Sequence, residues 1–272
     1  TGWSMYYYNA ITPVTFNGTY NGSPGYNINY SNSVFRPSTA GNVPTGTYGN
    51  IDFSSNGSYT LTLQGDVTST SSVQIYDSTS GQTSTLDLNG HNIITTGDFA
   101  VGPSWTQTYY SSLVNTGGID STVTVGGNLF IYTSDVNGVN QITANGVHTI
   151  NFTIAGNWTN YDTFTAGTST VTFNGAVAQT ITSANTFYNL TINNSYASPS
   201  DTYDVDPSAV QTVTNTLTVT DGQWTPNTGD TYKDVSIGAA GIIKPDASAS
   251  ISLSGNWTNS GTFTAGSSTV TF

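Results

Sequence analysis

The chain has 272 residues, of which 35% are hydrophobic and only 7% are charged, and its net charge is −12 at pH 7. All fifteen acidic residues are aspartates, and the basic residues other than histidine are Arg36, Lys233 and Lys244. So few cations exclude a nucleic-acid-binding surface, which must neutralise phosphates, and no apolar run reaches the roughly 18 residues of a membrane-spanning helix.

The composition favours strands over helices. Glu is absent and Lys, Arg and Met are almost absent, although these are good helix formers. Thr, Ser, Asn, Gly, Val and Tyr take their place and suit strands and turns. The lack of cysteine is compatible with a secreted protein of this size. Because the first residue is Thr1, we expect a mature chain whose signal peptide has been removed.

Residues 1–50 differ from the rest. They contain "MYYYN" and "NGTYNGSPGYNINYSNS", together with four prolines. Turn signals every few residues predict an irregular Tyr/Asn/Pro-rich segment that acts as an N-terminal cap or in assembly.

Residues 51–272 alternate apolar and polar residues in short runs. Examples are "SYTLTL", "STVTVGG", "HTINFTI", "NTLTVT" and "SISLSG", which Gly, Asn and Asp separate. This period of two is typical of strands with one buried face. The region is therefore predicted to be a β-strand repeat domain.

A weak motif recurs within these residues: Asn or Asp, an apolar residue, then usually a small one. The apolar members are Val67, Phe99, Leu129, Trp158, Leu190, Val235 and Trp257, with Leu217, which follows Thr216, as a degenerate member. Periods of this size indicate a solenoid, so we predict an all-β, right-handed β-solenoid or β-helix-like fold. The alternative is a tandem pair of immunoglobulin-like β-sandwiches of about 100 residues each.

A stronger repeat joins two long segments. "GNWTNYDTFTAGTSTVTF" starts at Gly156, and "GNWTNSGTFTAGSSTVTF" starts at Gly255. The first copy continues as "NGAVAQTITSANTFYNLTINN". Over roughly residues 60–272 the chain resembles tandem β-strand repeats of large secreted and cell-surface proteins of bacteria and some archaea. That resemblance implies a structural or adhesin-like role, no enzyme activity and no known binding residues.

The second copy stops at Phe272, whereas "PVTFNGTYNG" near the N-terminus echoes the "TVTFNGAVAQ" that continues the first copy. We therefore expect head-to-tail strand addition between subunits, which gives a homopolymer. The expected assembly residues are Val14, Thr15, Phe16, Val270, Thr271 and Phe272. The alternative is that the chain is part of a longer repeat array.

Other candidate sites are weaker. Asp201, Asp204 and Asp206 in "DTYDVD" are candidates for calcium, which prefers oxygen ligands, and no other cofactor is expected. Exposed aromatic residues could contact surface glycans, and the candidates are Trp105, Tyr109 and Tyr110. Asn-x-Ser/Thr triplets suggest N-glycosylation. The candidate triplets begin at Asn17, Asn29, Asn56, Asn151, Asn157, Asn189, Asn193 and Asn256.

Taken together, the sequence predicts an extracellular or cell-surface structural protein that is not an enzyme. Its expected partner is itself, in a filament or surface layer, with no nucleic acid and no transmembrane segment. A carbohydrate-binding adhesin module is the first alternative. A polysaccharide-degrading β-helix enzyme is the second, and it is disfavoured because such lyases commonly use a basic residue and this chain has few.

Overall fold

A computed structural model describes residues 3–5, 14–16, 32–36, 41–43, 45–55, 57–77, 81–104, 110–133, 139–144, 148–196 and 204–272. These residues form strands and turns without any helix, and nearly all of the strand pairs are parallel. The predicted all-β solenoid is confirmed. Immunoglobulin-like sandwiches, which consist of antiparallel sheets, are not what these strands build.

The chain divides into two compact units. Unit 1 comprises residues 1–150 and 161–165, and unit 2 comprises residues 151–160 and 166–272.

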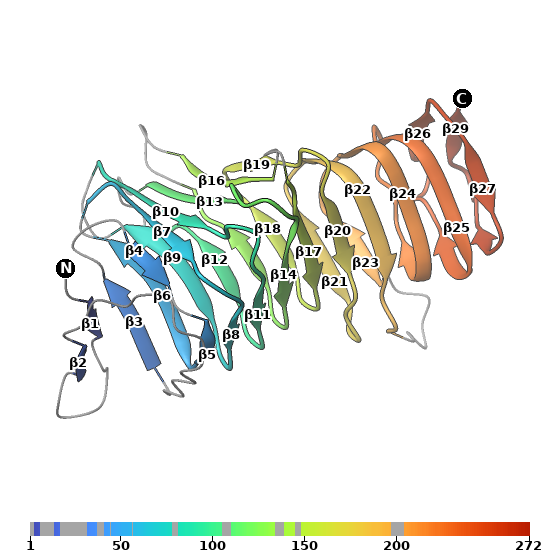
Figure 1. The fold of residues 1–272 in the computed structure, drawn as a ribbon. Coiled ribbons are helices and arrows are strands. Elements are labelled where there is room, and N and C mark those ends of the chain that lie inside the picture. The colour runs from blue at the N-terminus through green and yellow to red at the C-terminus, as the bar shows by residue number, and fades with distance from the viewer. Residues whose placement is uncertain are drawn as a thin grey trace. The chain divides into compact units, whose positions relative to one another are not determined.

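Unit 1 contains three parallel ladders. Ladder 1A consists of β3 (Asn32–Arg36), β6 (Asn50–Ser55), β9 (Val73–Asp77), β12 (Phe99–Val101) and β15 (Leu129–Ile131). Ladder 1B consists of β5 (Gly46–Tyr48), β8 (Val67–Ser69), β11 (Ile93–Thr95) and β14 (Ser121–Val125). Ladder 1C consists of β4 (Gly41–Val43), β7 (Tyr59–Leu63), β10 (Thr83–Asp87), β13 (Tyr110–Val114), β16 (Asn140–Thr143) and β19 (Thr163–Thr165). From β4 to β15 the chain visits 1C, 1B and 1A in turn, so each coil contributes one strand to each ladder (Figure 1).

Two antiparallel strands precede this parallel stack. β1 (Trp3–Met5) pairs antiparallel with β3, and β2 (Val14–Phe16) pairs antiparallel with β1. Parallel stacking begins at β3, within the segment expected to be irregular.

Unit 2 also contains three parallel ladders. Ladder 2A consists of β18 (Trp158–Asn160), β21 (Gln179–Thr182), β23 (Val205–Pro207), the ends of β24 and β25, and β28 (Thr262–Phe263). Ladder 2B consists of β17 (Ile150–Ile154), β20 (Thr170–Phe173), the middle parts of β22 (Asn185–Asn193), β24 (Gln211–Trp224) and β25 (Thr231–Ile243), and β27 (Trp257–Asn259). Ladder 2C consists of the first residues of β22, β24 and β25, then β26 (Ser250–Leu253) and β29 (Thr269–Thr271).

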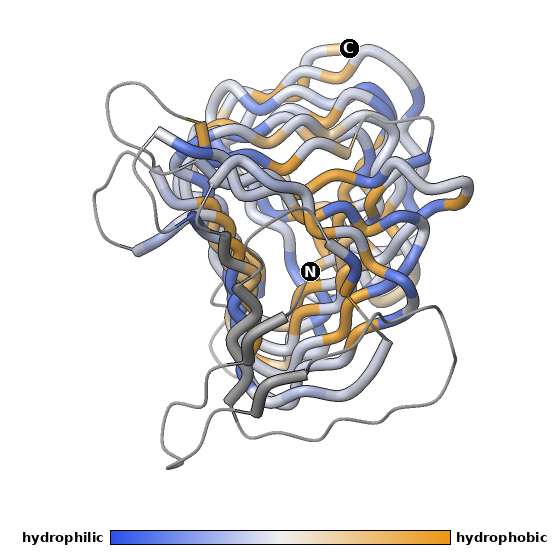
Figure 2. The backbone as a smooth tube through the Cα atoms, turned by 60° about the vertical axis from the view of Figure 1, so that its left-hand side comes forward, coloured by the Kyte–Doolittle hydropathy of each residue, from blue (hydrophilic) through white to orange (hydrophobic). Residues whose placement is uncertain are grey.

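Like residues stack on like residues in the core. In ladder 1C, Leu61, Leu86, Leu113 and Ile142 occupy the same register on successive strands, and all four are fully buried. Figure 2 shows the resulting alternation of apolar and polar residues along the backbone. Parallel in-register pairing makes this arrangement necessary, because an inward residue always lies over the inward residue of the coil below.

Asn, Asp and Ser side chains connect the corners of successive coils. At the start of the 1A strands, Ser72 N–H donates to Asn50 Oδ1 (3.2 Å), Asp98 N–H to Ser72 Oγ (3.2 Å) and Asn128 N–H to Asp98 Oδ1 (2.7 Å). The 1B corner repeats the arrangement, since Asn92 N–H donates to Asp66 Oδ1 (2.8 Å). The recurring Asn/Asp-apolar motif is therefore a corner that accepts a backbone hydrogen bond from the next coil.

The motif predicted coils but not their register. Val67 pairs with Ile93 in ladder 1B, whereas Phe99 pairs with Val73 and Leu129 in ladder 1A. Val67 and Phe99 therefore lie on different faces of the solenoid, and their spacing in the sequence is not the length of one coil. Corners of both ladders use the same chemistry, so the motif alone does not distinguish them.

Alanine substitutions of the neighbouring residues Ile93 and Ile94 test which face of β11 points into the core. Ile93 is fully buried and Ile94 is 48% exposed. We expect Ile93→Ala to lower the free energy of unfolding by about 2–5 kcal/mol, and Ile94→Ala to change it by no more than about 0.5 kcal/mol. Denaturant unfolding of both variants measures the difference, and equal effects would contradict the assigned faces.

Candidate functional site

The strands β27, β28 and β29 form one edge of unit 2. β27 and β28 pair with β25, and β29 pairs with β26. In the registers of the described strands, each of the three has this one pairing partner. Their outer backbone groups form an open parallel edge, which is a template for adding another strand.

The inward side chains of this coil form an apolar end patch, which consists of Trp257, Phe263, Val270 and Phe272. The first three are half-buried, although each pairs with a strand position whose own inward residue is buried. Phe272 is 78% exposed. The Trp257 ring packs edge-on against Phe263 (centroids 5.0 Å apart) and Phe272 (6.4 Å). Among the described residues, this apolar cluster is therefore covered on one side only.

The first repeat copy shows what covers such a side. Trp158 is fully buried, with ring centroids 6.1 Å from Phe152 and 5.5 Å from Phe187. Its Nε1–H donates to Asn185 Oδ1 (3.0 Å). Phe187 and Asn185 belong to β22, in the segment that continues the first copy. In the first copy, "ANTFYNLTINN" thus supplies a layer against Trp158, and no described segment takes that place beside Trp257.

The two repeat copies occupy different faces of unit 2. Trp158 lies in ladder 2A, whereas Trp257 pairs with Val235 in ladder 2B. Ladder 2B also contains Val171 of the first copy. The offset in sequence between the copies is therefore not a whole number of coils. The same residues fit both faces because each face requires an inward apolar residue after an Asn corner.

The expected assembly residues are partly described. Val14, Thr15 and Phe16 form β2, which pairs on one edge with β1. Val270 and Thr271 lie in β29, and Phe272 follows it. Both segments are strands, and their role in assembly stays a prediction.

Of the three aromatic residues expected to contact glycans, the structure describes Tyr110. Trp105 and Tyr109 lie outside the described residues. Tyr110 is half-buried at the start of β13, in register with Thr83.

The three aspartates expected to bind calcium differ in their surroundings. Asp201 lies outside the described residues, and the buried Asp204 accepts a hydrogen bond from Gln223 N–H at Oδ2 (2.8 Å). Asp206 is half-buried in β23. No three His or Asp side chains of the described chain are grouped closely enough to hold a metal ion. Each histidine lies beside one aspartate: His91 beside Asp66 (3.9 Å) and His148 beside Asp120 (3.6 Å).

Several glycosylation candidates take part in corner hydrogen bonds. Asn151 Oδ1 accepts from Thr170 N–H (2.9 Å), Asn157 Oδ1 from Thr180 N–H (2.7 Å), and Asn189 Oδ1 from Asn215 Nδ2 (2.8 Å). Asn193 and Asn256 are exposed. Asn17, Asn29 and Asn56 lie outside the described residues.

Asp230 is a buried carboxylate that the sequence did not single out. It accepts hydrogen bonds from Gln211 N–H (2.7 Å), the Tyr232 hydroxyl (2.7 Å) and Asn227 N–H (3.1 Å). Burial raises the pKa of Asp230 despite these donors, and burial and Asp230 raise the pKa of Tyr232 well above its usual value. Trp224 Nε1–H donates to the Tyr232 hydroxyl (3.0 Å), which extends the network into the core.

The raised pKa of Asp230 predicts a stability that depends on pH. The folded state binds the proton more tightly than the unfolded state, so this contribution is present below the ordinary aspartate pKa and is lost as pH rises through the raised pKa. Asp204 and Asp206, whose pKa values are also raised mainly by burial, act in the same direction. We expect the melting temperature to rise as pH falls from neutral to mildly acidic.

Asp230→Asn should weaken this pH dependence, because the titrating group is gone. The matched control is Asp234→Asn, which removes one negative charge 3.9 Å from Lys233 Nζ and not beside a histidine. Thermal unfolding across the pH range measures both variants. A melting temperature that falls on mild acidification would contradict the assignment.

No family model, no curated protein and no solved structure matches this chain. Among the described residues, no helix is long and apolar enough to cross a membrane.

Proposed function

We propose that this protein is an extracellular structural subunit of a cell-surface filament or surface layer, and that it acts by assembly rather than by catalysis. The observation that carries the proposal is the open edge of β27–β29 with its half-covered end patch. A strand or coil from a second copy covers that patch and pairs with the edge.

Charge favours contact between copies at this edge. The net charge is −12, yet residues 247–272, which include β27–β29, contain no charged side chain. Two copies can therefore meet at the β27–β29 coil without placing like charges against each other. The Thr- and Asn-rich exterior supplies hydrogen bonding without long charged side chains.

The interchangeable faces also favour contact between copies. The tryptophan of the first sequence repeat lies in ladder 2A, and that of the second repeat lies in ladder 2B. A segment of this kind from a second protein molecule can therefore stack on the edge in more than one rotational position. In the proposal, β2 supplies one such segment: within the described residues it pairs with β1 alone, which leaves its other edge for strand addition. A contact of this kind joins two different surfaces and propagates into a filament.

Trp158 and Trp257 provide a matched pair to test the proposal. Trp158→Ala should lower the free energy of unfolding of the unassembled chain by about 3–5 kcal/mol, because it empties a fully buried site. Trp257→Ala should cost about 1–2 kcal/mol there, since the ring is half-buried, and should abolish polymers. Electron microscopy and sedimentation at increasing protein concentration report assembly.

A second variant, deletion of Val270–Phe272, removes β29 residues and should also abolish polymers while the chain still folds. If the native protein forms regular polymers and both changes leave them intact, the proposal is wrong. Intact-mass measurement of the native polypeptide adds a second criterion. The mass could show a longer chain, and microscopy could show dispersed single particles. Together, these results would mean that further repeats of the same chain cover the edge, and they would overturn assembly through it.

A further inference from the structure

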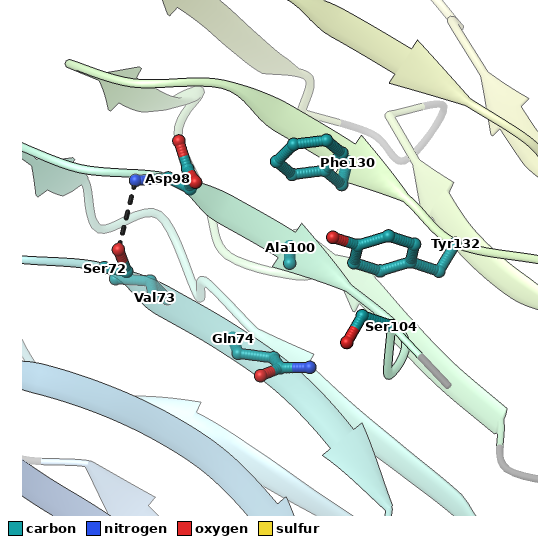
Figure 3. A pocket seen from close by; sticks show the side chains of 8 residues that line it. All are labelled: Ser72, Val73, Gln74, Asp98, Ala100, Ser104, Phe130 and Tyr132. Atoms are coloured by element: carbon teal, nitrogen blue, oxygen red, sulfur yellow. Dashed lines mark hydrogen bonds between the residues drawn. The ribbon is translucent and has the colours of Figure 1, made fainter. Parts of the chain in front are cut away.

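A shallow groove opens on the outer face of ladder 1A in unit 1. Its volume is about 170 Å³, and it lies over β9, β12 and β15. The side chains that line it are Ser72, Val73, Gln74, Asp98, Ala100, Ser104, Phe130 and Tyr132 (Figure 3). We call it the aromatic groove.

The groove exists because a small residue lies between two larger ones. Gln74, Ala100 and Phe130 occupy the same outward register on three neighbouring strands. Neighbouring strands are about 4.8 Å apart, so the methyl group of Ala100 leaves a depression between the amide and the phenyl ring. Figure 3 shows Ala100 at its floor, with Gln74 on one side and the two aromatic rings on the other.

One wall is a preformed aromatic pair. The rings of Phe130 and Tyr132 stack with centroids 5.2 Å apart and planes 4° from parallel, and both side chains are half-buried. Stacking fixes the orientation of each ring. A ligand that packs on the pair therefore meets an ordered apolar surface and loses little free energy in ordering it.

The rim carries fixed polar groups. Gln74 Nε2 donates to Gly102 O (3.1 Å), which holds Oε1 as an acceptor. Asp98 Oδ1 accepts from Asn128 N–H (2.7 Å) and Nδ2 (3.1 Å), which holds the carboxylate in place. Ser72 Oγ accepts from Asp98 N–H (3.2 Å), so its hydroxyl proton is directed elsewhere. Acceptors and a hydroxyl donor thus surround the aromatic wall.

The charge of the groove excludes anions. None of the eight lining residues is basic, and Asp98 gives the groove negative potential. Burial, then Asp98 and Tyr161, raise the pKa of Tyr132, so its hydroxyl stays protonated. A neutral ligand that offers hydroxyl groups and an apolar face matches this set of groups.

We propose that the aromatic groove binds one ring of a neutral saccharide with equatorial hydroxyls, of the β-glucose or N-acetyl-β-glucosamine type. The C–H face of the ring packs on the Phe130–Tyr132 pair, because the negative face of an aromatic ring attracts polarised C–H groups. The hydroxyls at the ring edge donate to Gln74 Oε1 and Asp98. The volume is below the roughly 300–1,000 Å³ of pockets for drug-sized ligands, which suits a single sugar ring.

No residue that lines the groove belongs to the end patch or to β2, so saccharide binding does not depend on the proposed assembly. It would give the protein a contact with a surface glycan that is independent of strand addition. The competing ligand is a quaternary ammonium cation, which aromatic rings and a carboxylate also attract.

Titration of the full-length chain with cellotriose, chitotriose and choline, followed by NMR or calorimetry, tests the proposal. We expect saturable binding of at least one trisaccharide in the millimolar range or tighter. Phe130→Ala removes the wall and Ala100→Leu fills the floor, and each should weaken binding at least tenfold. Tyr132→Phe keeps the ring and should cause a smaller loss. Tyr188→Ala, which removes a half-buried tyrosine of unit 2, should leave binding unchanged.

Circular dichroism melting confirms that each variant is folded. If Ala100→Leu does not fold, Phe130→Ala and Tyr132→Phe still decide the question. No binding of either trisaccharide by the folded protein would overturn the proposal. So would trisaccharide binding that survives Phe130→Ala, because the sugar would then bind elsewhere. Saturable choline binding that is lost in Phe130→Ala, without trisaccharide binding, would identify a cation site instead.

Discussion

Backbone hydrogen bonding between coils is the interaction on which the rest of this structure depends. In a parallel ladder, a strand pairs with the coil before it and the coil after it, and no strand satisfies its own backbone. The in-register core stacks, such as Leu61, Leu86, Leu113 and Ile142, follow from this pairing. Within the described residues, β27, β28 and β29 each pair on one side, with β25 or β26, and the proposed assembly would supply the pairing on the other side.

The corners extend the same pairing into side chains. Asn50, Ser72, Asp98 and Asn128 each lie at the start of a 1A strand and connect successive coils. At such corners, side-chain oxygens of Asn, Ser and Asp accept hydrogen bonds from backbone N–H groups of the next coil. The turns therefore need few charged residues. A surface with few charges is then compatible with a folded chain, and in the proposed assembly it lets the end patch pack on another apolar layer.

Much of the fold could be predicted from sequence, and the limits have physical causes. Alternation of apolar and polar residues predicted the strands, and the Asn/Asp motif predicted corners. Register could not be predicted, because corners of different ladders share one chemistry; Trp158 and Trp257 look equivalent in sequence but lie in different ladders. The aromatic groove was missed because Gln74, Ala100 and Phe130 are far apart in sequence and meet only through ladder register. Asp230 was missed because nothing local marks a buried carboxylate.

Hydrogen–deuterium exchange of the backbone amides in residues 257–271 tests the central claim most directly. An open coil edge exposes amides that an added coil would pair, so the unassembled chain should exchange them rapidly while the paired strands β22 and β24 stay protected. On assembly, the same amides of β27 and β29 should become protected, with little change elsewhere in unit 2. Amides of residues 257–271 that exchange equally fast in the unassembled and assembled states would contradict the claim that this edge stacks on another coil.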